Sequence, residues 1–426
     1  MKRSTIDFGI DLGLTQSCIA VFEEDAAKVI PNALGSLTTP SAVYIDPRGG
    51  IHVGHNARTR AMIDDPDNGD IEFRHRMGQG EAGKKRFVRS GREMLPEELS
   101  AEVLKSLKTD VQSSMGKELR AAVITVPAWF EKSSVNATRR AAKLAGYLAS
   151  PLLLEPVAAS LAYGMQNEND NVFWLVYHLG DGSFDAALMR IRDGWIQLII
   201  HNGDLFLGGK LIDWDIVTKK LVPVLTGTFN LPEFTRGNPR WEKTFSIMKY
   251  YAELAKIEVC RSKAPYEIWI EGLCRDEGGK EVDFAYTLTP QDVEEISKPY
   301  MKKSTDICHK IVKASGLKES DLKYVLMVGE ATSNPWVREA VQTELGSQVE
   351  FGIDPVTVVA RGAAIFASTQ AMFPDKSLQT PKENPPAAIG EVEDAILNPP
   401  DSGTQELTDL TDFLIHENTY LKKEDK

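Results

Sequence analysis

Two segments of the chain, about 170 residues apart, carry glycine, hydroxyl and carboxylate residues in the same order around a short turn. Residues 6–21 read IDFGIDLGLTQSCIAV and residues 172–189 read VFWLVYHLGDGSFDAALM. In each segment an apolar strand leads into a glycine-containing turn and then into a second apolar strand. Because glycine has no Cβ, such a turn can present several backbone N–H groups to one anion. The pattern therefore predicts a phosphate-binding loop in each segment.

The side chains at the edges of these turns fit the same chemistry. Thr15 and Ser183 supply hydroxyl donors. Asp11 and Asp185 are suited to hydrated Mg²⁺, which prefers a few carboxylates together with phosphate oxygens and water. Either hairpin alone is equally typical of an ordinary glycine turn. Internal repetition is the stronger signal, and it favours a duplicated fold whose two lobes grip a polyphosphate from both sides.

Composition limits the classes of protein to which the chain can belong. Its 426 residues leave room for two or three domains, and 42% hydrophobic with 26% charged residues is typical of soluble globular proteins. The net charge of −12 argues against a general binder of nucleic acids or anionic membranes. No run approaches the ~18 apolar residues of a membrane span. The start, MKRSTIDFGID, lacks a signal-peptide core, and the four cysteines are widely spaced, so we expect a cytoplasmic protein with reduced thiols.

The expected elements divide the chain into two lobes and a tail. We predict lobe I over residues 1–182, with an outer subdomain at about 41–117, and lobe II over residues 183–370, with an outer subdomain at about 208–290. Apolar runs, helical spacing and turn residues predict the elements within the lobes. In chain order these are a strand at 42–45, a helix at 96–115, a strand at 119–127, a helix at 133–146, a strand at 152–155 followed by a helix, a strand at 324–328, and helices at 335–345 and 358–367.

Two segments read as irregular. Residues 64–92 are rich in Gly, Arg and Lys, which predicts a solvated basic loop. From Pro374 onward, prolines are frequent and 12 Asp and Glu stand against 5 Lys and Arg. Such a composition cannot bury enough apolar surface to fold, so we expect residues 371–426 to form a disordered acidic tail.

Seven motifs together resemble a known family. IDLGLTQSCIAV, ITVPAWF, EPVAASLAYG, HLGDGSFD, GDLFLGG, ELAKIEV and MVGEATSNP occur in the order and near the spacing of the Hsp70 nucleotide-binding domain. The resemblance covers residues 5 to about 370, and it is more specific for Hsp70 than for actin or a sugar kinase. It implies an α/β fold of the duplicated, actin-like (ribonuclease H-like) two-lobe ATPase type, with ATP or ADP and Mg²⁺ as cofactors.

The resemblance also implies a role for each matching residue. The first phosphate loop would be Gly13, Leu14, Thr15 and Gln16, and the second Gly180, Asp181, Gly182 and Ser183. Asp11 and Asp185 would lie by the metal, Glu155 would help orient the attacking water or its metal network, and Arg74 and His178 would take catalytic positions around the phosphates. Glu253 and Lys256 would clasp the ribose and base, and Gly329, Glu330 and Ala331 would form the adenine-side turn.

Several of these positions depart from the family pattern. His178 replaces an Asp of the metal and water network, and a neutral imidazole cannot supply that charge. Leu14 replaces a Thr beside the γ-phosphate, Asp181 replaces a loop glycine, and Arg74 replaces a Lys. On the adenine side the family's Gly-Ser-Thr-Arg run reads EATS, and Val356 replaces an Asp. Phosphoryl transfer depends on positioning and electrostatic stabilisation, so these changes predict weakened catalysis and nucleotide affinity.

Two functions remain open on this basis. The first is an Hsp70-like chaperone ATPase domain that binds ATP or ADP with Mg²⁺ and hydrolyses ATP slowly. The second is a pseudo-ATPase scaffold that binds nucleotide weakly or not at all and acts through a protein partner, such as a co-chaperone, exchange factor or client. About 55 polar residues follow the expected core, too few for a peptide-binding domain. A metabolite kinase of the same superfamily has no support, because the motifs are those of Hsp70.

Overall fold

The computed structural model describes most of the expected two-lobe region. The described residues are 5–165, 168, 171–192, 195–346, 348–350 and 352–370. The acidic tail expected at 371–426 lies outside them.

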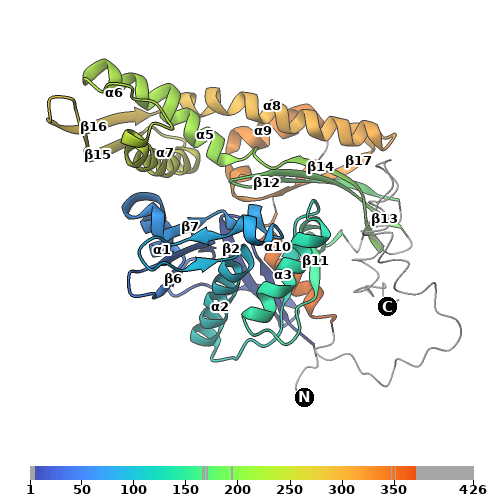
Figure 1. Cartoon of the computed structure of the whole chain (residues 1–426). Coiled ribbons are helices and arrows are strands. Elements are labelled where there is room, and N and C mark those ends of the chain that lie inside the picture. The colour runs from blue at the N-terminus through green and yellow to red at the C-terminus, as the bar shows by residue number, and fades with distance from the viewer. Residues whose placement is uncertain are drawn as a thin grey trace, which may run out of the picture.

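Two sheets of the same topology form the centres of the two lobes (Figure 1). The first sheet has the order β11-β10-β1-β2-β3, with β4 paired to β2, and the second has the order β18-β17-β12-β13-β14. The first consists of β1 (Phe8–Asp11), β2 (Gln16–Glu23), β3 (Ala26–Val29), β4 (Thr39–Pro40), β10 (Val123–Val126) and β11 (Leu152–Leu154). The second consists of β12 (Phe173–Leu179), β13 (Phe184–Arg192), β14 (Trp195–Asp204), β17 (Leu322–Val328) and β18 (Gln348–Glu350).

The pairing directions also repeat. The strands β1, β2 and β3 form an antiparallel meander, and β10 and β11 add to it in parallel. In the second sheet β12, β13 and β14 form the meander, and β17 and β18 add in parallel. This repetition confirms the predicted duplicated two-lobe fold of the actin-like type.

Helices cover both sheets. In the first lobe these are α2 (Pro96–Met115), α3 (Lys132–Leu144), α4 (Glu155–Ala162) and α10 (Val358–Ala367), and in the second α8 (Pro290–Ala314) and α9 (Pro335–Leu345). The bounds of α2, α9 and α10 are those that the sequence predicts. At the start of α8 the hydroxyl of Thr289 accepts a hydrogen bond from the N–H of Asp292. The carboxylate of Asp292 accepts one in return from the N–H of Thr289, so both backbone N–H groups of this capping box have partners.

The sheets divide the chain at other points than expected. The second sheet begins with β12, so a boundary after residue 182 falls inside the β12–β13 hairpin. Helix α10, expected in lobe II, packs against β1, β2 and α4 of the first lobe. The chain therefore leaves the first lobe after α4 and returns to it with α10.

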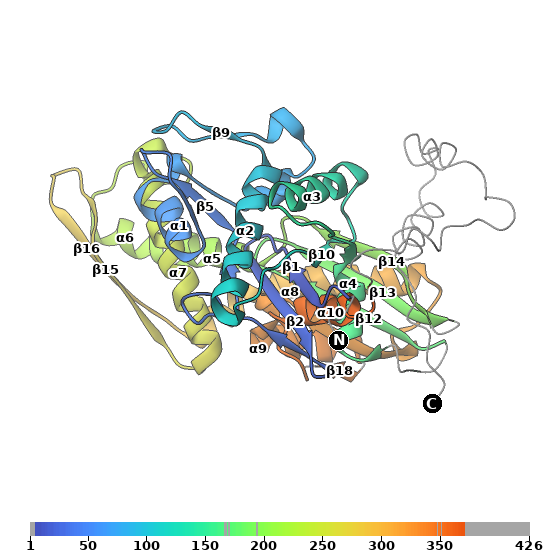
Figure 2. The same ribbon diagram turned by 90° about the horizontal axis from the view of Figure 1, so that it is seen from below.

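Each lobe carries an outer subdomain, and both lie at the same end of the molecule (Figure 2). The first holds β5 (Ala42–Ile45), β6 (Ile51–Val53), β7 (Gly69–Ile71), β8 (Lys85–Arg86), β9 (Glu93–Met94) and α1 (His55–Thr59). The second holds α5 (Gly209–Ile216), α6 (Val222–Thr228), α7 (Glu242–Ser262), β15 (Tyr266–Arg275) and β16 (Glu281–Leu288). Short π-helical turns occur at Arg60–Asp64 and Val217–Leu221, and 3-10 turns at Pro66–Asn68, Phe73–Arg76, Gly80–Gly83, Pro239–Trp241, Glu319–Asp321 and Glu330–Ser333.

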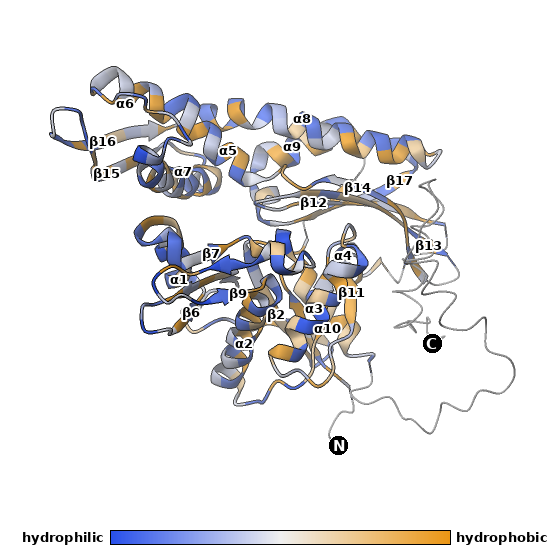
Figure 3. Ribbon diagram, viewed as in Figure 1, coloured by the Kyte–Doolittle hydropathy of each residue, from blue (hydrophilic) through white to orange (hydrophobic). Residues whose placement is uncertain are grey.

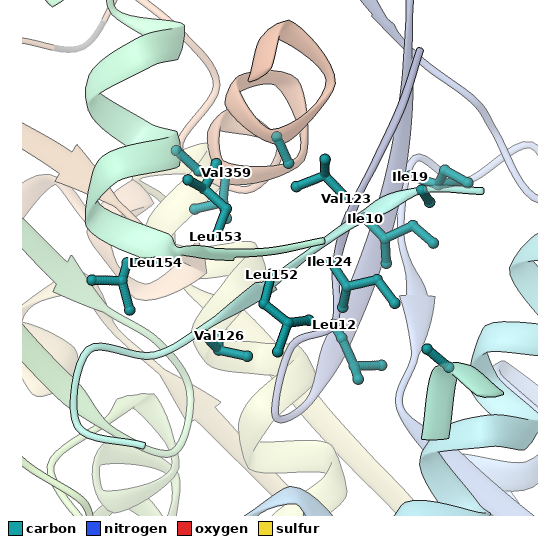
Figure 4. Close-up of a cluster of buried hydrophobic side chains, with 14 of the residues drawn as sticks. Ile10, Leu12, Ile19, Val123, Ile124, Val126, Leu152, Leu153, Leu154 and Val359 are labelled. Carbon is teal, nitrogen blue, oxygen red and sulfur yellow. The ribbon is translucent and has the colours of Figure 1, made fainter. Parts of the chain in front are cut away.

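Aliphatic side chains fill the space between the first sheet and its helices. Figure 3 shows hydrophobic residues along β11 in the interior and hydrophilic residues in the loop that joins β5 to β6. Figure 4 shows the centre of this core, in which Ile10, Ile124 and Leu152 come from three neighbouring strands and Val359 comes from α10. Among the described residues, no helix combines the length and the apolar run that crossing a membrane would need.

Residues 64–92 differ from the solvated loop that their composition predicts. Phe73, Met77 and Phe87 are buried in the core of the first lobe. Arg74 and Arg76 pair with Glu155 and Asp70 instead of facing solvent. The buried residues are isolated among charged ones, without the period of a helix or strand, so sequence pattern alone could not reveal them.

Helices α4 and α10 approach each other so closely that a side chain at Gly362 would not fit. A Cβ built there would collide with the backbone carbonyl of Ala158. Gly227, in helix α6, has open space around the same position.

We therefore expect Gly362→Ala to destabilise the protein by about 1–3 kcal/mol, because the two helices would have to move apart. The matched substitution Gly227→Ala should be neutral or stabilising by up to about 1 kcal/mol, since alanine favours a helix. Urea unfolding followed by circular dichroism measures both. Equal effects of the two substitutions would contradict the proposed close approach.

Candidate functional site

Two adjoining pockets, one between the lobes and one within the second lobe, are together lined by all eighteen residues that the sequence singles out. The hairpin pocket, of about 90 Å³, lies between the two glycine turns. The α7 pocket, of about 400 Å³, lies beside helix α7. The hairpin pocket is lined by Asp11, Gly13, Leu14, Thr15, Gln16, Arg74, Glu155, His178, Gly180, Asp181, Gly182, Ser183, Asp185, Gly329 and Glu330. The α7 pocket is lined by Glu253, Lys256 and Ala331, and it shares Asp181 and Glu330.

Each glycine turn is held in place by a neighbouring segment. In the first turn, the carbonyl of Gly13 accepts from the hydroxyl of Ser41 at 2.8 Å, and the carbonyl of Thr15 accepts from the N–H of Ser41 at 2.8 Å. In the second turn, the carbonyl of Gly180 accepts from the N–H of Gly209 at 3.1 Å, at the start of α5. The loops are therefore positioned by the outer subdomains as well as by their own strands.

The two turns meet directly across the cleft. A Cβ at Gly182 would collide with Cδ2 of Leu14, so the leucine side chain of the first turn lies on the backbone of the second. The Nζ of Lys210 and the Nε2 of His75 lie at 3.4 and 3.6 Å from the same Cβ position. Leu14 thus occupies part of the space between the loops, which accounts for the small volume of the hairpin pocket.

Buried carboxylates dominate the interior of this pocket. Asp11 accepts from the Thr125 hydroxyl at 3.1 Å. Burial raises the pKa of Asp11 to about 7, and the negative charge of Glu155 adds to the shift. Burial also raises the pKa of Asp185, although His201, whose Nδ1 lies 3.7 Å from its Oδ1, opposes the shift. That Oδ1 atom is buried without a hydrogen-bond partner, so it remains available to a ligand.

The catalytic candidates Arg74, Glu155 and His178 form one contact network. Arg74 donates to Glu155 at 2.9 Å, and both side chains are about 7% exposed. The Nδ1 of His178 lies 3.4 Å from the other oxygen of Glu155. The guanidinium of Arg74 therefore points at the carboxylate of Glu155 as well as toward the space between the loops. Arg74 is the one positively charged side chain among the described residues that line this pocket, and its ion pair with Glu155 weakens its attraction for phosphates.

The charges around the hairpin pocket fit a metal ion. Its described lining contains five carboxylates (Asp11, Glu155, Asp181, Asp185 and Glu330) and one guanidinium. A bare polyphosphate would be repelled by this excess of negative charge, whereas a divalent cation would bridge the two. Within the described residues, no three Asp, Glu, His or Cys side chains converge as a complete ligand set. Mg²⁺ needs only one or two carboxylates when phosphate oxygens and water complete its shell, so Asp11 and Asp185 fit such an ion.

A second network lies beneath the α7 pocket. Glu253 and Lys256, which α7 places on one face at i and i+3, both contribute to it. Lys256 pairs with the fully buried Asp213 at 2.7 Å and donates to the carbonyl of Gly209 at 3.1 Å. Although burial lowers the pKa of Lys256, the carboxylates of Asp213 and Asp181 outweigh it and hold that pKa above its usual value. Lys256 is therefore a fixed cation under the pocket floor.

Glu253 links the two lobes. Its carboxylate accepts from Arg58 of the first lobe at 2.5 Å and from Lys249 at 3.1 Å. Burial raises the pKa of Glu253, but Lys249 and Arg58 outweigh it and hold that pKa at about 2. A second pair across the cleft joins Lys210 to Glu72 at 2.8 Å. The cleft is thus closed by two ion pairs on the side of the outer subdomains.

The wall of the α7 pocket is largely apolar. Ile257, Cys260 and Val356 line it next to Ala331. Val356 stands where the resemblance predicts an Asp, and Ser333 stands where it predicts the Arg that stacks on a base. A flat ring can enter such a pocket by apolar contact, and Arg261, Ser333 and Asn334 in the same lining can hydrogen-bond to its edge.

Sequence reasoning missed several residues that hold the site together. These are Arg58, Thr125, His201, Asp213 and Lys249. Asp213 lies only four residues after the quoted GDLFLGG motif, and a charged residue on the apolar face of α5 was the available signal. Arg58 and Glu253 are 195 residues apart, and no local pattern connects them.

Breaking the Arg58–Glu253 pair should open the cleft. We expect Arg58→Ala to increase the rate of amide hydrogen exchange in residues 12–15 and 180–183 about three- to tenfold, because closure loses an ion pair that is mostly shielded from solvent. Hydrogen exchange read by mass spectrometry measures this. Arg89→Ala is the matched control, since Arg89 pairs with Asp65 inside the first outer subdomain and not across the cleft. If both variants exchange at the same rate, the pair does not hold the lobes together.

The buried Asp11 carboxyl should make stability depend on pH. The folded protein keeps its proton up to about pH 7, whereas the unfolded chain releases it near pH ~4. This contribution to stability is therefore complete below pH ~4 and is lost as the pH rises through 7. Asp11→Asn mimics the protonated form, so its free energy of unfolding should exceed that of the unsubstituted protein by roughly 1–4 kcal/mol at pH 8 and match it below pH ~4.

Urea unfolding without nucleotide or metal, at pH 4, 6 and 8, tests this expectation. Asp25→Asn, at an exposed turn, controls for the change in net charge. A difference between Asp11→Asn and the unsubstituted protein that does not vary with pH would contradict it.

The family comparison agrees with this architecture. The protein-family model described as "Hsp70 protein" matches residues 7–376, which is most of the 426-residue chain. The match includes both glycine turns, helix α7 and the turn at Gly329, and it confirms the resemblance seen in the seven motifs. The chain belongs to the Hsp70 family.

Proposed function

We propose that this chain is an Hsp70-type chaperone ATPase domain that binds ATP or ADP with Mg²⁺ and hydrolyses ATP slowly. The observation that carries the proposal is the convergence of all eighteen predicted residues on two adjoining pockets, one between the lobes and one within the second lobe. The triphosphate would lie in the hairpin pocket, and the nucleoside would lie in the α7 pocket. Membership in the Hsp70 family supports nucleotide binding of this kind.

In this proposal each group has one task. The backbone N–H groups of both glycine turns would bind phosphate oxygens, and the hydroxyls of Thr15 and Ser183 would add donors. Asp11 and Asp185 would hold Mg²⁺ through carboxylate oxygens or water, and the ion would neutralise phosphate charge. Glu155 would orient the attacking water, and Arg74 would stabilise charge on the transferred group.

Slow turnover follows from three features. His178 contributes no negative charge to the metal network, and Arg74 is shared with Glu155. Leu14 must also move from Gly182 before a triphosphate can enter between the loops. Lobes I and II would therefore move as separate domains, because entry of the ligand requires them to part.

The second candidate is a pseudo-ATPase scaffold with weak or no nucleotide binding. The contact of Leu14 with Gly182, together with the 90 Å³ volume of the hairpin pocket, favours it. Such a scaffold would act through a protein partner, for which a co-chaperone, an exchange factor or a client is the expected class. For either function, four widely spaced cysteines in 426 residues support a reducing, cytoplasmic setting.

Calorimetric titration with ATP and ADP in the presence of Mg²⁺ separates the two candidates. The proposed ATPase requires a dissociation constant of about 10 µM or tighter. If millimolar nucleotide gives no heat of binding, the ATPase candidate is excluded and the pseudo-ATPase scaffold is left.

If nucleotide binds, restoring the carboxylate should raise turnover. We expect His178→Asp to increase the single-turnover rate of ATP hydrolysis by about tenfold or more, because an Asp would complete the metal and water network. His55→Asp introduces the same change at an exposed position of α1 and should leave the rate unchanged. An unaltered rate in His178→Asp would mean that position 178 does not limit the reaction.

A further inference from the structure

A third cavity, of about 440 Å³, lies between the two outer subdomains. The first lobe contributes Met62 and Glu72 to its lining, and the second contributes Lys210, Trp214 and Arg236. None of its lining residues lines the hairpin pocket or the α7 pocket. It is therefore a separate space in the same cleft, and its volume is within the ~300–1,000 Å³ range of ligand sites.

The charge of this lining is opposite to that of the chain. Lys210, Arg236 and Lys249 line it with a single carboxylate, Glu72, although the whole protein has a net charge of −12. Lys210 is paired with Glu72 and Lys249 with Glu253, so Arg236 is the cation of this lining for which no ion pair is described. The hairpin pocket has the reverse balance, with five carboxylates and one guanidinium in its described lining. A positively charged cavity in an acidic protein concentrates anions.

The lining also offers aromatic surface. Phe206 lines this cavity and is 69% exposed, although one side of its ring is stacked with His75, with ring centroids 6.2 Å apart. Arg236 lies over the ring of Trp214, with Cζ 3.7 Å from the ring centroid. Arg236 is exposed, and no ion pair of it with a carboxylate is described among the residues of the structure, so the edge of its guanidinium can donate two hydrogen bonds to an anion.

We propose that this cavity binds a small aromatic anion, of the aromatic carboxylate or sulfonate class. The ring would lie against Phe206 and Met62, and the anionic group would face Arg236. Because walls from both lobes would contact the ligand, its binding would favour the closed cleft. A smaller pocket of about 10 Å³ lies between this cavity and the glycine turns. Its lining includes Glu72 and Lys249, which belong to the cavity, and Thr15 and Asp181, which belong to the turns.

Fluorine NMR of protein labelled with 5-fluorotryptophan tests the proposal without nucleotide. The chain has seven tryptophans, and Trp214→Phe assigns the signal of Trp214. Titration with 2-naphthoate should shift this signal in a saturable way, with a dissociation constant of about 1 mM or tighter. Cyclohexanecarboxylate, which has the charge without the aromatic ring, should bind more weakly. No saturation of the Trp214 signal by about 10 mM, or equal shifts of all seven signals, would overturn the proposal.

Two matched pairs of variants locate the ligand. Arg236→Ala should weaken binding about five- to tenfold. Arg240→Ala should leave it unchanged, because Arg240 lies over the ring of Trp241 in a similar way but outside the cavity. Ser246→Phe should fill the cavity and abolish the shift, whereas Lys243→Phe, at an exposed position of the same helix, should not. Equal affinity in Arg236→Ala and Arg240→Ala would overturn the assignment, even if Ser246→Phe fails to fold.

Discussion

The cleft is closed by opposite charges that each lobe holds separately and that meet only when the lobes come together. Arg58 and Glu72 belong to the first lobe, and Glu253 and Lys210 belong to the second. An isolated buried charge is costly, whereas a paired one is tolerated. Opening the cleft therefore exposes both partners of each pair to water at the same time, and closing it requires both to be desolvated. The position of the glycine turns, and so the size of the space between them, depends on this balance.

The balance of charge differs between the hairpin pocket, at the interior of the cleft, and the two ion pairs at its rim. At the rim, cations and carboxylates are matched in pairs. In the interior, carboxylates outnumber the single guanidinium of the described lining, which Glu155 already engages. Burial then favours the protonated form of Asp11. An interior of this kind accepts an anionic ligand only together with cations, and this makes metal and nucleotide interdependent in any binding reaction.

The sequence was informative wherever a local pattern determined the structure. Helix α9 follows the Asn334 cap and Pro335 and ends before Gly346, so its bounds could be predicted from residue type alone. The repeated hairpins predicted the duplicated sheets and the turn residues between them, whereas Arg74, Glu155, Glu253 and Lys256 followed only from the family resemblance. The pairing of Arg58 with Glu253 could not be predicted, because it joins residues of different lobes that no periodicity relates. The contact of Leu14 with Gly182 depends likewise on how far the lobes close, which composition does not determine.

The return of α10 to the first lobe has a consequence for synthesis of the protein. Ala360 and Ala364 complete a small buried cluster with Cys18 and Ala20, and the N–H of Ile6 donates to the carbonyl of Gln370 at 3.1 Å. Helix α10 begins 204 residues after β11 ends (358 − 154), so during translation the strands that α10 covers stay exposed until the ribosome has made about 200 residues beyond the completed first sheet. The second lobe, whose strands and helices are contiguous from residue 173 to 350, can fold during that interval. The nascent chain would thus acquire its later lobe first, and chaperones that bind exposed apolar strands would meet the N-terminal half of a protein that is itself of the Hsp70 family.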